Sequence, residues 1–238
     1  MPLIKPGDDL TSIILKAIRK IGGLREGDVV VIASKAVATA QGRFRQLDKI
    51  IPSSRAKEIS SKSGQSPEFV ELVIREADKI LNVCKGAVLT IKHGLICANA
   101  GADLSNAPKG HAILMPVKPD RVANEILGKL TSGKKERIGL IISDSVVHPL
   151  RLGTVGQAIG VAGIKPVIDC RGKMDIYGNT LRITFRAIAD QLATAAQLAM
   201  GEDGERVPVV VIRNVEIKLT ERQKISPKIS KNQCLYLG

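Results

Sequence analysis

The chain has 238 residues, 44% of them hydrophobic and 25% charged, which is ordinary for a folded domain that buries a large core. Its 36 Lys and Arg against 23 Asp and Glu give a net charge of +13, which favours anionic partners. Aromatic residues are scarce and no block of Lys and Arg is present, so the composition argues against nucleic acid as the partner.

The four cysteines, Cys84, Cys97, Cys170 and Cys234, lie far apart and form no CxxC pair. This spacing argues against a thiolate zinc site or a disulfide framework and suits a reducing cytoplasm. The N-terminal sequence MPLIKPGDDL has no apolar signal core, and no apolar run reaches membrane-spanning length. We therefore expect a cytoplasmic protein without membrane contact. No linker divides the chain, so residues 1–238 are expected to form a single domain.

The elements expected in the first half follow from apolar spacing, caps and turn residues. They are helices over 10–21, 53–63 and 66–81, a buried strand over 28–34, and two β-rich runs over 87–98. Asp8 or Asp9 caps the first helix, and Ser66 followed by Pro67 starts the third. His93 and Gly94 form the turn between the two β-rich runs.

The second half predicts a helix capped by Asp120, a strand over 138–142, a polar loop over 169–180, a helix over 186–200 and a strand over 207–212. The run at 138–142 is apolar throughout, which is typical of a strand buried on both faces. Asp144 follows where this strand is expected to end. Its carboxylate would then reach the edge of the sheet at which ligands gather in α/β proteins.

Glycines follow this strand at positions 153, 156, 160 and 163. Two interpretations stay open for them. They leave backbone amides uncovered, so a phosphate group could approach closely, or they allow tight packing of one element on another. The spacing matches neither the P-loop nor the GxGxxG dinucleotide fingerprint.

Three isolated acids, Asp103, Asp144 and Glu202, occupy segments rich in small residues. Asp103 and Asp144 each follow a buried strand, and their hard oxygens could share a divalent cation. The alternative for the loop at 99–106 is a plain surface loop held by its own Asn and Asp side chains. The acidic turn at 201–206 follows a helix C-terminus, where negative charge is disfavoured, and a bound cation would relieve that conflict. In a basic chain these acids predict metal-assisted chemistry on an anionic, phosphorylated substrate.

Several motifs, in order along nearly the whole chain, resemble those of the coenzyme F420-0:γ-glutamyl ligases. They are PLIKPGDDL, SKAVATAQGR, NAGADLSN, ISDSVVHPLRLGTVGQAIGVAG, DIYGNTL and AMGEDGERVPVVVIR. The resemblance implies an α+β fold of two similar intertwined halves with mixed and antiparallel sheets, in a homodimer with its site near the interface. It also implies a GDP-forming ligase that adds L-glutamate to F420-0 and F420-1 through an acyl phosphate. GTP is the implied co-substrate, with Mg²⁺ or Mn²⁺ and K⁺ as cofactors.

Carried over by motif, the resemblance implies four metal ligands: Asp103, Asp144, Ser145 and Glu202. It implies that GTP is bound by Pro2, Leu3, Ile4, Lys5, Ser34, Lys35, Thr39, Asn106, Met200, Gly201, Glu202, Asp203, Gly204, Glu205, Arg206 and Val207. Asp103, Asp144 and Arg151 are the candidate catalytic residues. Lys35, Arg43 and Arg151 are candidates for holding phosphate or carboxylate groups.

This sequence departs from the family pattern at two places that bear on binding. Thr39 stands where many members carry Lys, and VVHPL at 146–150 replaces a more familiar FGRPW. The second departure motivates an alternative, a related ligase that adds an amino acid to another acidic acceptor. A nucleic-acid-binding protein is a third hypothesis, motivated only by the net charge of +13.

Overall fold

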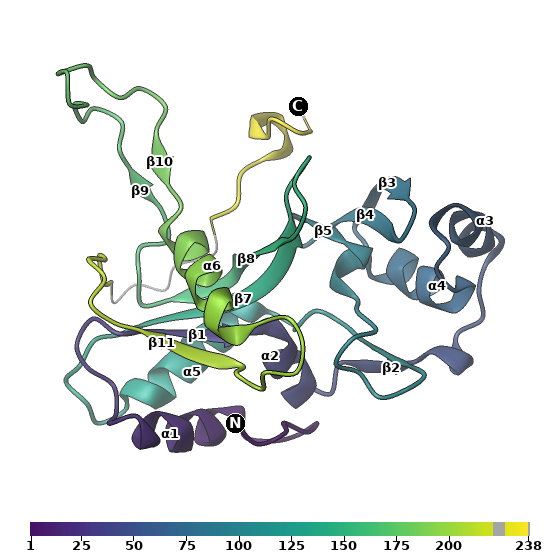
Figure 1. Cartoon of the computed structure of the whole chain (residues 1–238), viewed down its shortest axis with the longest axis horizontal. Coiled ribbons are helices and arrows are strands. Elements are labelled where there is room, and N and C mark those ends of the chain that lie inside the picture. The colour runs from purple at the N-terminus through teal and green to yellow at the C-terminus, as the bar shows by residue number, and fades with distance from the viewer. Residues whose placement is uncertain (221–226, 238) are drawn as a thin grey trace.

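The computed structural model describes residues 1–220 and 227–237 and has two regions, one on each side of Figure 1. The larger region is built on a four-stranded sheet in the order β11 (Val209–Ile212), β1 (Val29–Ala33), β7 (Gly139–Val147) and β8 (Thr154–Ala162). The two central strands are parallel, and each outer strand is antiparallel to its neighbour. All Val and Ile residues of β1 and the Ile residues of β7 are fully buried, as their continuous apolar runs predict, whereas Val147 at the end of β7 is 55% exposed.

Helices cover both faces of this sheet (Figure 1). On one face α1 (Leu10–Lys20), α2 (Ser34–Ala40) and α5 (Pro119–Thr131) pack on the side chains of Val30, Ile32, Leu140 and Ile142. On the other face α6 (Ile188–Met200) packs on Val29, Val31 and Ile141. The alternation along β1 and β7 therefore divides the core into two layers.

The smaller region contains α3 (Ser54–Ser63) and α4 (Pro67–Glu76). These helices pack on an antiparallel sheet of β3 (Lys79–Cys84), β4 (Ala87–Lys92) and β5 (Leu95–Ala98). A two-stranded ribbon of β2 (Phe44–Gln46) and β6 (His111–Ile113) connects this region to the end of α2. Short 3₁₀ turns lie at Leu47–Lys49, Asn99–Gly101 and Lys231–Gln233.

A hairpin arm at residues 168–186 projects away from the larger region (Figure 1). Its base is the short antiparallel pair β9 (Ile168–Asp169) and β10 (Phe185–Arg186). Four apolar side chains of the arm, Met174, Ile176, Tyr177 and Ile183, are at least 74% exposed. The loop predicted at 169–180 thus forms most of this arm.

The mixed and antiparallel sheets with their helices confirm the α+β class. The similarity and intertwining of two halves, and the single domain over 1–238, stay predictions. Within the residues that the structure describes, no helix is long and apolar enough to cross a membrane.

Most helix starts agree with the prediction. Asp9 caps α1 by accepting a hydrogen bond from the Ser12 N–H, and Ser66 caps α4 with Pro67 in the first turn. His93 has a positive φ of 51° in the turn between β4 and β5.

Two helix predictions are wrong in detail. The third helix ends at Glu76, not at Leu81, because Ala77 turns to extended backbone and the Asp78 N–H donates to the Ile91 carbonyl at 2.8 Å. Residues 79–84 then pair with β4, so strand pairing overrides a spacing that also fits a helix. The expected cap Asp120 lies inside the first turn of α5, and Lys118 occupies the cap position. The Asp120 carboxylate instead accepts a hydrogen bond from the Val161 N–H of β8 at 3.0 Å.

The glycines after β7 serve close packing. A Cβ at Gly156 would lie 2.4 Å from the Ala193 carbonyl of α6, and one at Gly160 would lie 2.6 Å from the Pro119 carbonyl of α5. Since approaches below 3.0 Å are not tolerated, both helices contact β8 directly through these positions. Of the two open interpretations, tight packing is confirmed at these two glycines.

Candidate functional site

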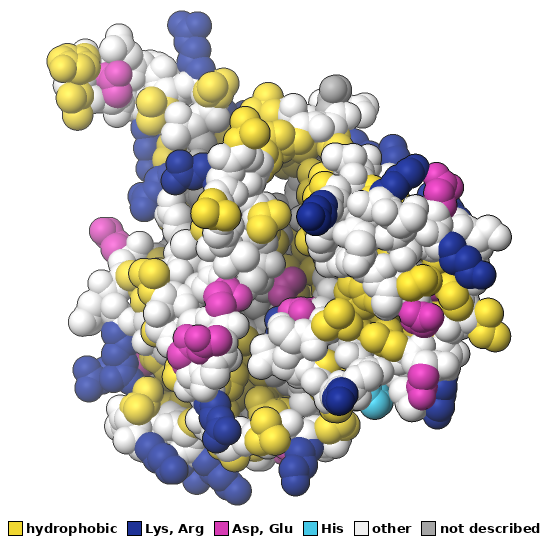
Figure 2. All heavy atoms as spheres, turned by 45° about the vertical axis from the view of Figure 1, so that its right-hand side comes forward, with side chains coloured by type: hydrophobic (Ala, Val, Ile, Leu, Met, Phe, Trp, Pro, Cys, Tyr) yellow, Lys and Arg dark blue, Asp and Glu magenta, His cyan; other side chains and the backbone are white. Residues whose placement is uncertain are grey.

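A cavity of about 630 Å³ opens where the larger region meets the N-terminal segment, and this volume lies within the range of small-molecule sites. It is lined by residues 1–6, residues 33–36 with Thr39 and Phe44, the loop at 106–108, residues 143–145 of β7, and Gln197 with residues 200–204 and 206–208. Figure 2 shows acidic side chains beside the hollow near the centre of the face. Segments far apart in the sequence therefore meet at one site.

The side chains proposed to bind the nucleotide line this cavity, with one exception. Those present are Pro2, Leu3, Ile4, Lys5, Ser34, Lys35, Thr39, Asn106, Met200, Gly201, Glu202, Asp203, Gly204, Arg206 and Val207. Glu205 is absent from the lining and bends back within its loop, where its carboxylate accepts the Asp203 N–H at 3.0 Å. That carboxylate occupies the space beside Gly201 that a Cβ would need. The role of these residues toward a nucleotide stays a prediction.

The parallel pairing of β1 with β7 brings Ser34 and Asp144 together. Ala33 is the register partner of Ser143, so the residues that follow them lie side by side where the parallel pairing of β1 with β7 ends. The Ser34 hydroxyl donates to Asp144 Oδ1 at 2.6 Å. The strand itself was expected to end before Asp144 but continues to Val147, paired with β8.

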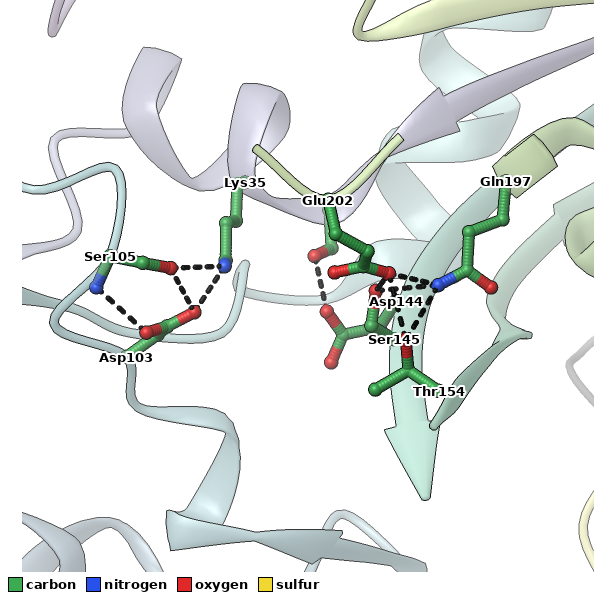
Figure 3. Close-up of polar contacts among 9 residues, drawn as sticks. Lys35, Asp103, Ser105, Asp144, Ser145, Thr154, Gln197 and Glu202 are labelled. Carbon is green, nitrogen blue, oxygen red and sulfur yellow. Dashed lines mark hydrogen bonds and ion pairs between the residues drawn. The ribbon is translucent and has the colours of Figure 1, made fainter. Parts of the chain in front are cut away.

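Asp103 lies in a loop of the smaller region and faces Lys35 of the larger one. The loop is shaped by Asn99 and Ala100, both of which have positive φ. Asp103 forms an ion pair with Lys35 and accepts hydrogen bonds from the Ser105 N–H at 2.8 Å and hydroxyl at 2.7 Å. Figure 3 shows this group on one side of Asp144. Asp103 does not line the cavity itself, but its ion-pair partner does.

Glu202 is held on the other side of the site, in the loop that follows α6. Its Oε1 accepts hydrogen bonds from the hydroxyls of Ser145 at 2.8 Å and Thr154 at 3.1 Å, and from the Gln197 amide (Figure 3). Thr154 and Gln197 were not anticipated from the sequence. The only signal for Thr154 is that it follows Gly153, and Gln197 lies within an alanine-rich helix that offers no signal.

The two central carboxylates have opposite pKa shifts. Burial raises the pKa of Asp144 above its ordinary value of 3.8, although the Ser34 hydrogen bond and the Lys35 charge oppose this. Burial also acts to raise the pKa of Asp103, but hydrogen bonds from Lys35 and Ser105 outweigh it, and the net pKa is lowered. Asp144 is thus the carboxylate whose charge is least compensated, which is the situation that a bound cation would relieve.

The donor set fits a hard divalent cation in chemical type, since it consists of carboxylate and hydroxyl oxygens. The side chains as placed do not gather around one point: in the described part of the chain, no three His, Cys, Asp or Glu side chains are grouped closely enough to hold a metal ion. The single ion shared by Asp103, Asp144 and Glu202 therefore stays a prediction. Any ion here would need further oxygens, and substrate phosphates are the usual source.

Two arginines lie outside the cavity lining. Arg151 is exposed in the turn between β7 and β8, where its N–H donates to the His148 carbonyl at 3.2 Å. Arg43 donates to the Met115 carbonyl at 3.0 Å and pairs with Glu76 at 3.3 Å. This placement gives Arg43 a role in joining the ribbon to α4, and it lends no support to a phosphate-holding role for either residue.

The fold and the cavity define an α+β protein with a small-molecule site whose lining carries acids, hydroxyls and the lysines Lys5 and Lys35. A family model described as F420-0:Gamma-glutamyl ligase matches residues 1–214. The chain therefore belongs to the F420-0:γ-glutamyl ligase family.

Named relatives agree with this assignment. The chain is 41% identical to the coenzyme F420:L-glutamate ligase of Methanopyrus kandleri over 217 residues, 91% of this chain and 84% of the relative. It is 40% identical to the coenzyme F420:L-glutamate ligase of Methanocaldococcus jannaschii over 232 residues, 96% of this chain and 92% of the relative. The relative of the same name from Archaeoglobus fulgidus is 38% identical over 217 residues, 91% of this chain and 86% of the relative.

Proposed function

We propose that this protein is a GTP-dependent ligase that joins L-glutamate to coenzyme F420-0 through a γ-glutamyl amide, in coenzyme F420 biosynthesis. One observation carries the proposal in this family member. All the residues expected to bind GTP except Glu205 line one cavity together with Asp144.

The proposed reaction has two steps. The γ-phosphoryl group of GTP passes to a carboxylate of the acceptor, which forms an acyl phosphate and releases GDP. The glutamate amine then attacks the acyl carbon, the bond to the phosphate oxygen breaks, phosphate leaves and the amine loses a proton. Both steps bring anionic groups together, so positioning and charge compensation are the main tasks of the site.

The residues of the site divide these tasks. Lys35 would turn from Asp103 toward the phosphates, where its ammonium group compensates negative charge. The 2–5 and 200–207 segments would enclose the nucleotide together, and the Met1 ammonium already joins them by donating to the Arg206 carbonyl at 3.0 Å. Asp103, Asp144, Ser145 and Glu202 would hold Mg²⁺ or Mn²⁺, which supplies charge neutralisation at the phosphates, and K⁺ is proposed as a further cofactor.

An end-point assay tests this function directly. Purified protein is incubated with F420-0, GTP, MnCl₂, KCl and L-glutamate, and products are separated by liquid chromatography with mass detection. We expect GDP together with a deazaflavin heavier by one glutamyl residue, and further additions would appear as a ladder. Folded protein that yields neither product would refute the proposal, and replacing GTP by ATP measures the nucleotide preference.

A second candidate function rests on the VVHPL segment. Its residues Val147 and Leu150, with the nearby Leu152, are 55%, 105% and 106% exposed. The turn between β7 and β8 therefore offers an apolar surface. We propose as the alternative a ligase of the same reaction class that acts on a different acidic acceptor. GTP consumption with a panel of other carboxylate acceptors, but not with F420-0, would favour the alternative.

We further propose that the protein is a homodimer, because the hairpin arm exposes Met174, Ile176, Tyr177 and Ile183 to solvent in the isolated chain. Light scattering after gel filtration should give twice the chain mass of 25.5 kDa. Ile176→Asp should shift the protein toward monomer, whereas Ile51→Asp, at a side chain 83% exposed outside the arm, should not. A wild-type monomer at micromolar concentration would contradict the dimer.

A further inference from the structure

The hydrogen bonds around Glu202 form a closed polar cluster of four side chains from three elements and one loop. Gln197 Nε2 donates to the hydroxyl oxygens of Ser145 and Thr154, at 3.2 Å each. Both hydroxyls donate in turn to Glu202 Oε1, which also accepts from Gln197. The Glu202 carboxylate beside the amide nitrogen fixes the amide orientation, because a carboxylate only accepts and would repel the amide oxygen at that place.

This cluster leaves the second carboxylate oxygen of Glu202 available. Among residues 1–220 and 227–237, no hydrogen bond reaches Oε2, whereas Oε1 accepts three. Figure 3 shows the carboxylate with one oxygen directed at Gln197 and the other directed away from it. Glu202 also lines the cavity, so the available oxygen belongs to a side chain that a ligand can reach.

Close packing fixes the position of Gln197. One turn earlier on α6, the Thr194 hydroxyl donates to the Gly156 carbonyl of β8 at 2.9 Å. The missing side chain of Gly156 lets the helix backbone approach β8 at Ala193. The register of α6 on β8 therefore sets where Gln197 meets Thr154, which lies two residues before Gly156 on β8.

Other contacts of the loop that carries Glu202 include an internal bond from the Asp203 N–H to Glu205 and a bond from the Met1 ammonium to the Arg206 carbonyl, each at 3.0 Å. Gly201 ends α6 with a φ of 69°, and residues 202–206 are exposed. A carboxylate just beyond a helix C-terminus is also disfavoured by the helix dipole. Donors from β7, β8 and α6 offset that cost and tie the loop to rigid elements.

We propose that Gln197 and Thr154 are positioning residues of the ligase site, which hold Glu202 so that its Oε2 is presented to a divalent cation; this rests on the proposed function. In this role the two side chains act on the cation through Glu202 and not by direct contact with it, and Gln197 also lines the cavity. They act through the orientation of one carboxylate, in the way that partners of metal-binding carboxylates commonly do.

The test measures cation binding without turnover. Mn²⁺ is titrated into protein saturated with GDP and followed by electron paramagnetic resonance of the free ion. Gln197→Met keeps the side-chain length and removes the donors, and Thr154→Val keeps the shape and removes the hydroxyl. We expect each to weaken Mn²⁺ binding by roughly 10- to 100-fold, the usual cost of losing a partner of a metal-binding side chain.

Matched controls separate positioning from folding. Gln191→Met, at an exposed glutamine of the same helix, should bind Mn²⁺ as the wild type does, and Thr154→Ser should restore most of the affinity lost in Thr154→Val. Thermal unfolding midpoints are measured on all variants. Wild-type affinity in both Gln197→Met and Thr154→Val, equal loss in Gln191→Met, or no Mn²⁺ binding by the wild type would each overturn the proposal.

The outcome is also separable from that of the ligase assay. Weakened Mn²⁺ binding in the two variants, in a protein that makes no glutamyl product from F420-0, would leave the positioning role standing and refute only the acceptor. A wild type that forms product, with variants that keep full Mn²⁺ affinity, would refute only the positioning role.

Discussion

Asp144→Asn is expected to reduce glutamate ligation by roughly 10³-fold or more in kcat/KM, because it removes a ligand of the proposed cation, and the charge that this cation neutralises at a phosphoryl group is worth several kcal/mol. Asparagine keeps the shape and still accepts the Ser34 hydroxyl through its carbonyl oxygen, so the local structure should survive. Rates are measured as GDP release over a range of GTP and Mn²⁺ concentrations.

Stability and a control separate this effect from unfolding. Asp144 is desolvated in the folded protein, so removing its charge should not lower the thermal unfolding midpoint. Asp48→Asn makes the same exchange in the 3₁₀ turn of the smaller region, away from the cavity lining, and should keep wild-type activity. Near wild-type kcat/KM in Asp144→Asn would contradict the proposed site, and so would equal loss in Asp48→Asn.

Lys35→Met is expected to produce two effects of opposite sign. Ligation should fall by roughly 10²-fold or more, since a cation that compensates the transferred phosphate is removed. Mn²⁺ binding without nucleotide should instead become tighter. The reason is that the Lys35 ammonium ion-pairs with Asp103 and lowers the pKa of that carboxyl, so it competes with any other cation for the same oxygens.

The second effect is the sharper one, because general damage to the site would weaken binding. Mn²⁺ affinity is measured for wild type and variant, each with and without GDP. Lys16→Met, at an exposed lysine of α1, is the matched control and should change neither quantity. Mn²⁺ affinity that is unchanged or lower in Lys35→Met without GDP would show that the ion pair does not restrict access to Asp103.

Local patterns were sufficient where the deciding contacts are local. The starts of α1 and α4 were predicted because Asp9 and Ser66 cap them through residues three positions later. The buried strand β1 and the buried first half of β7, residues 139–143, were predicted from continuous apolar runs. The end of α4 was missed because pairing of β3 with β4, a contact between separate segments, decides the structure beyond Ala77.

The candidate site shows the same division. The motif resemblance placed most of the cavity-lining residues, including Ser34, Lys35 and Asp144. It also proposed Arg151, which the structure leaves exposed in a turn, and Glu205, which bends away within its own loop. Thr154 and Gln197 were missed because their role depends on their contacts with Glu202. A threonine in a strand and a glutamine in a helix give no sign of such contacts in the sequence.

By itself the sequence determined the α+β class, the principal helices and strands, the family and the residue types available for chemistry. These depend on spacing, caps and motifs that are readable along one segment at a time. Only the tertiary structure decided that Lys35 pairs with Asp103, that α6 packs closely on β8 at Gly156, and that Gln197 and Thr154 hydrogen-bond to Glu202. Apart from the contact of Gln197 with Glu202, five positions along the chain, each of these contacts joins residues at least 37 positions apart, and a linear pattern does not encode which distant side chains will meet.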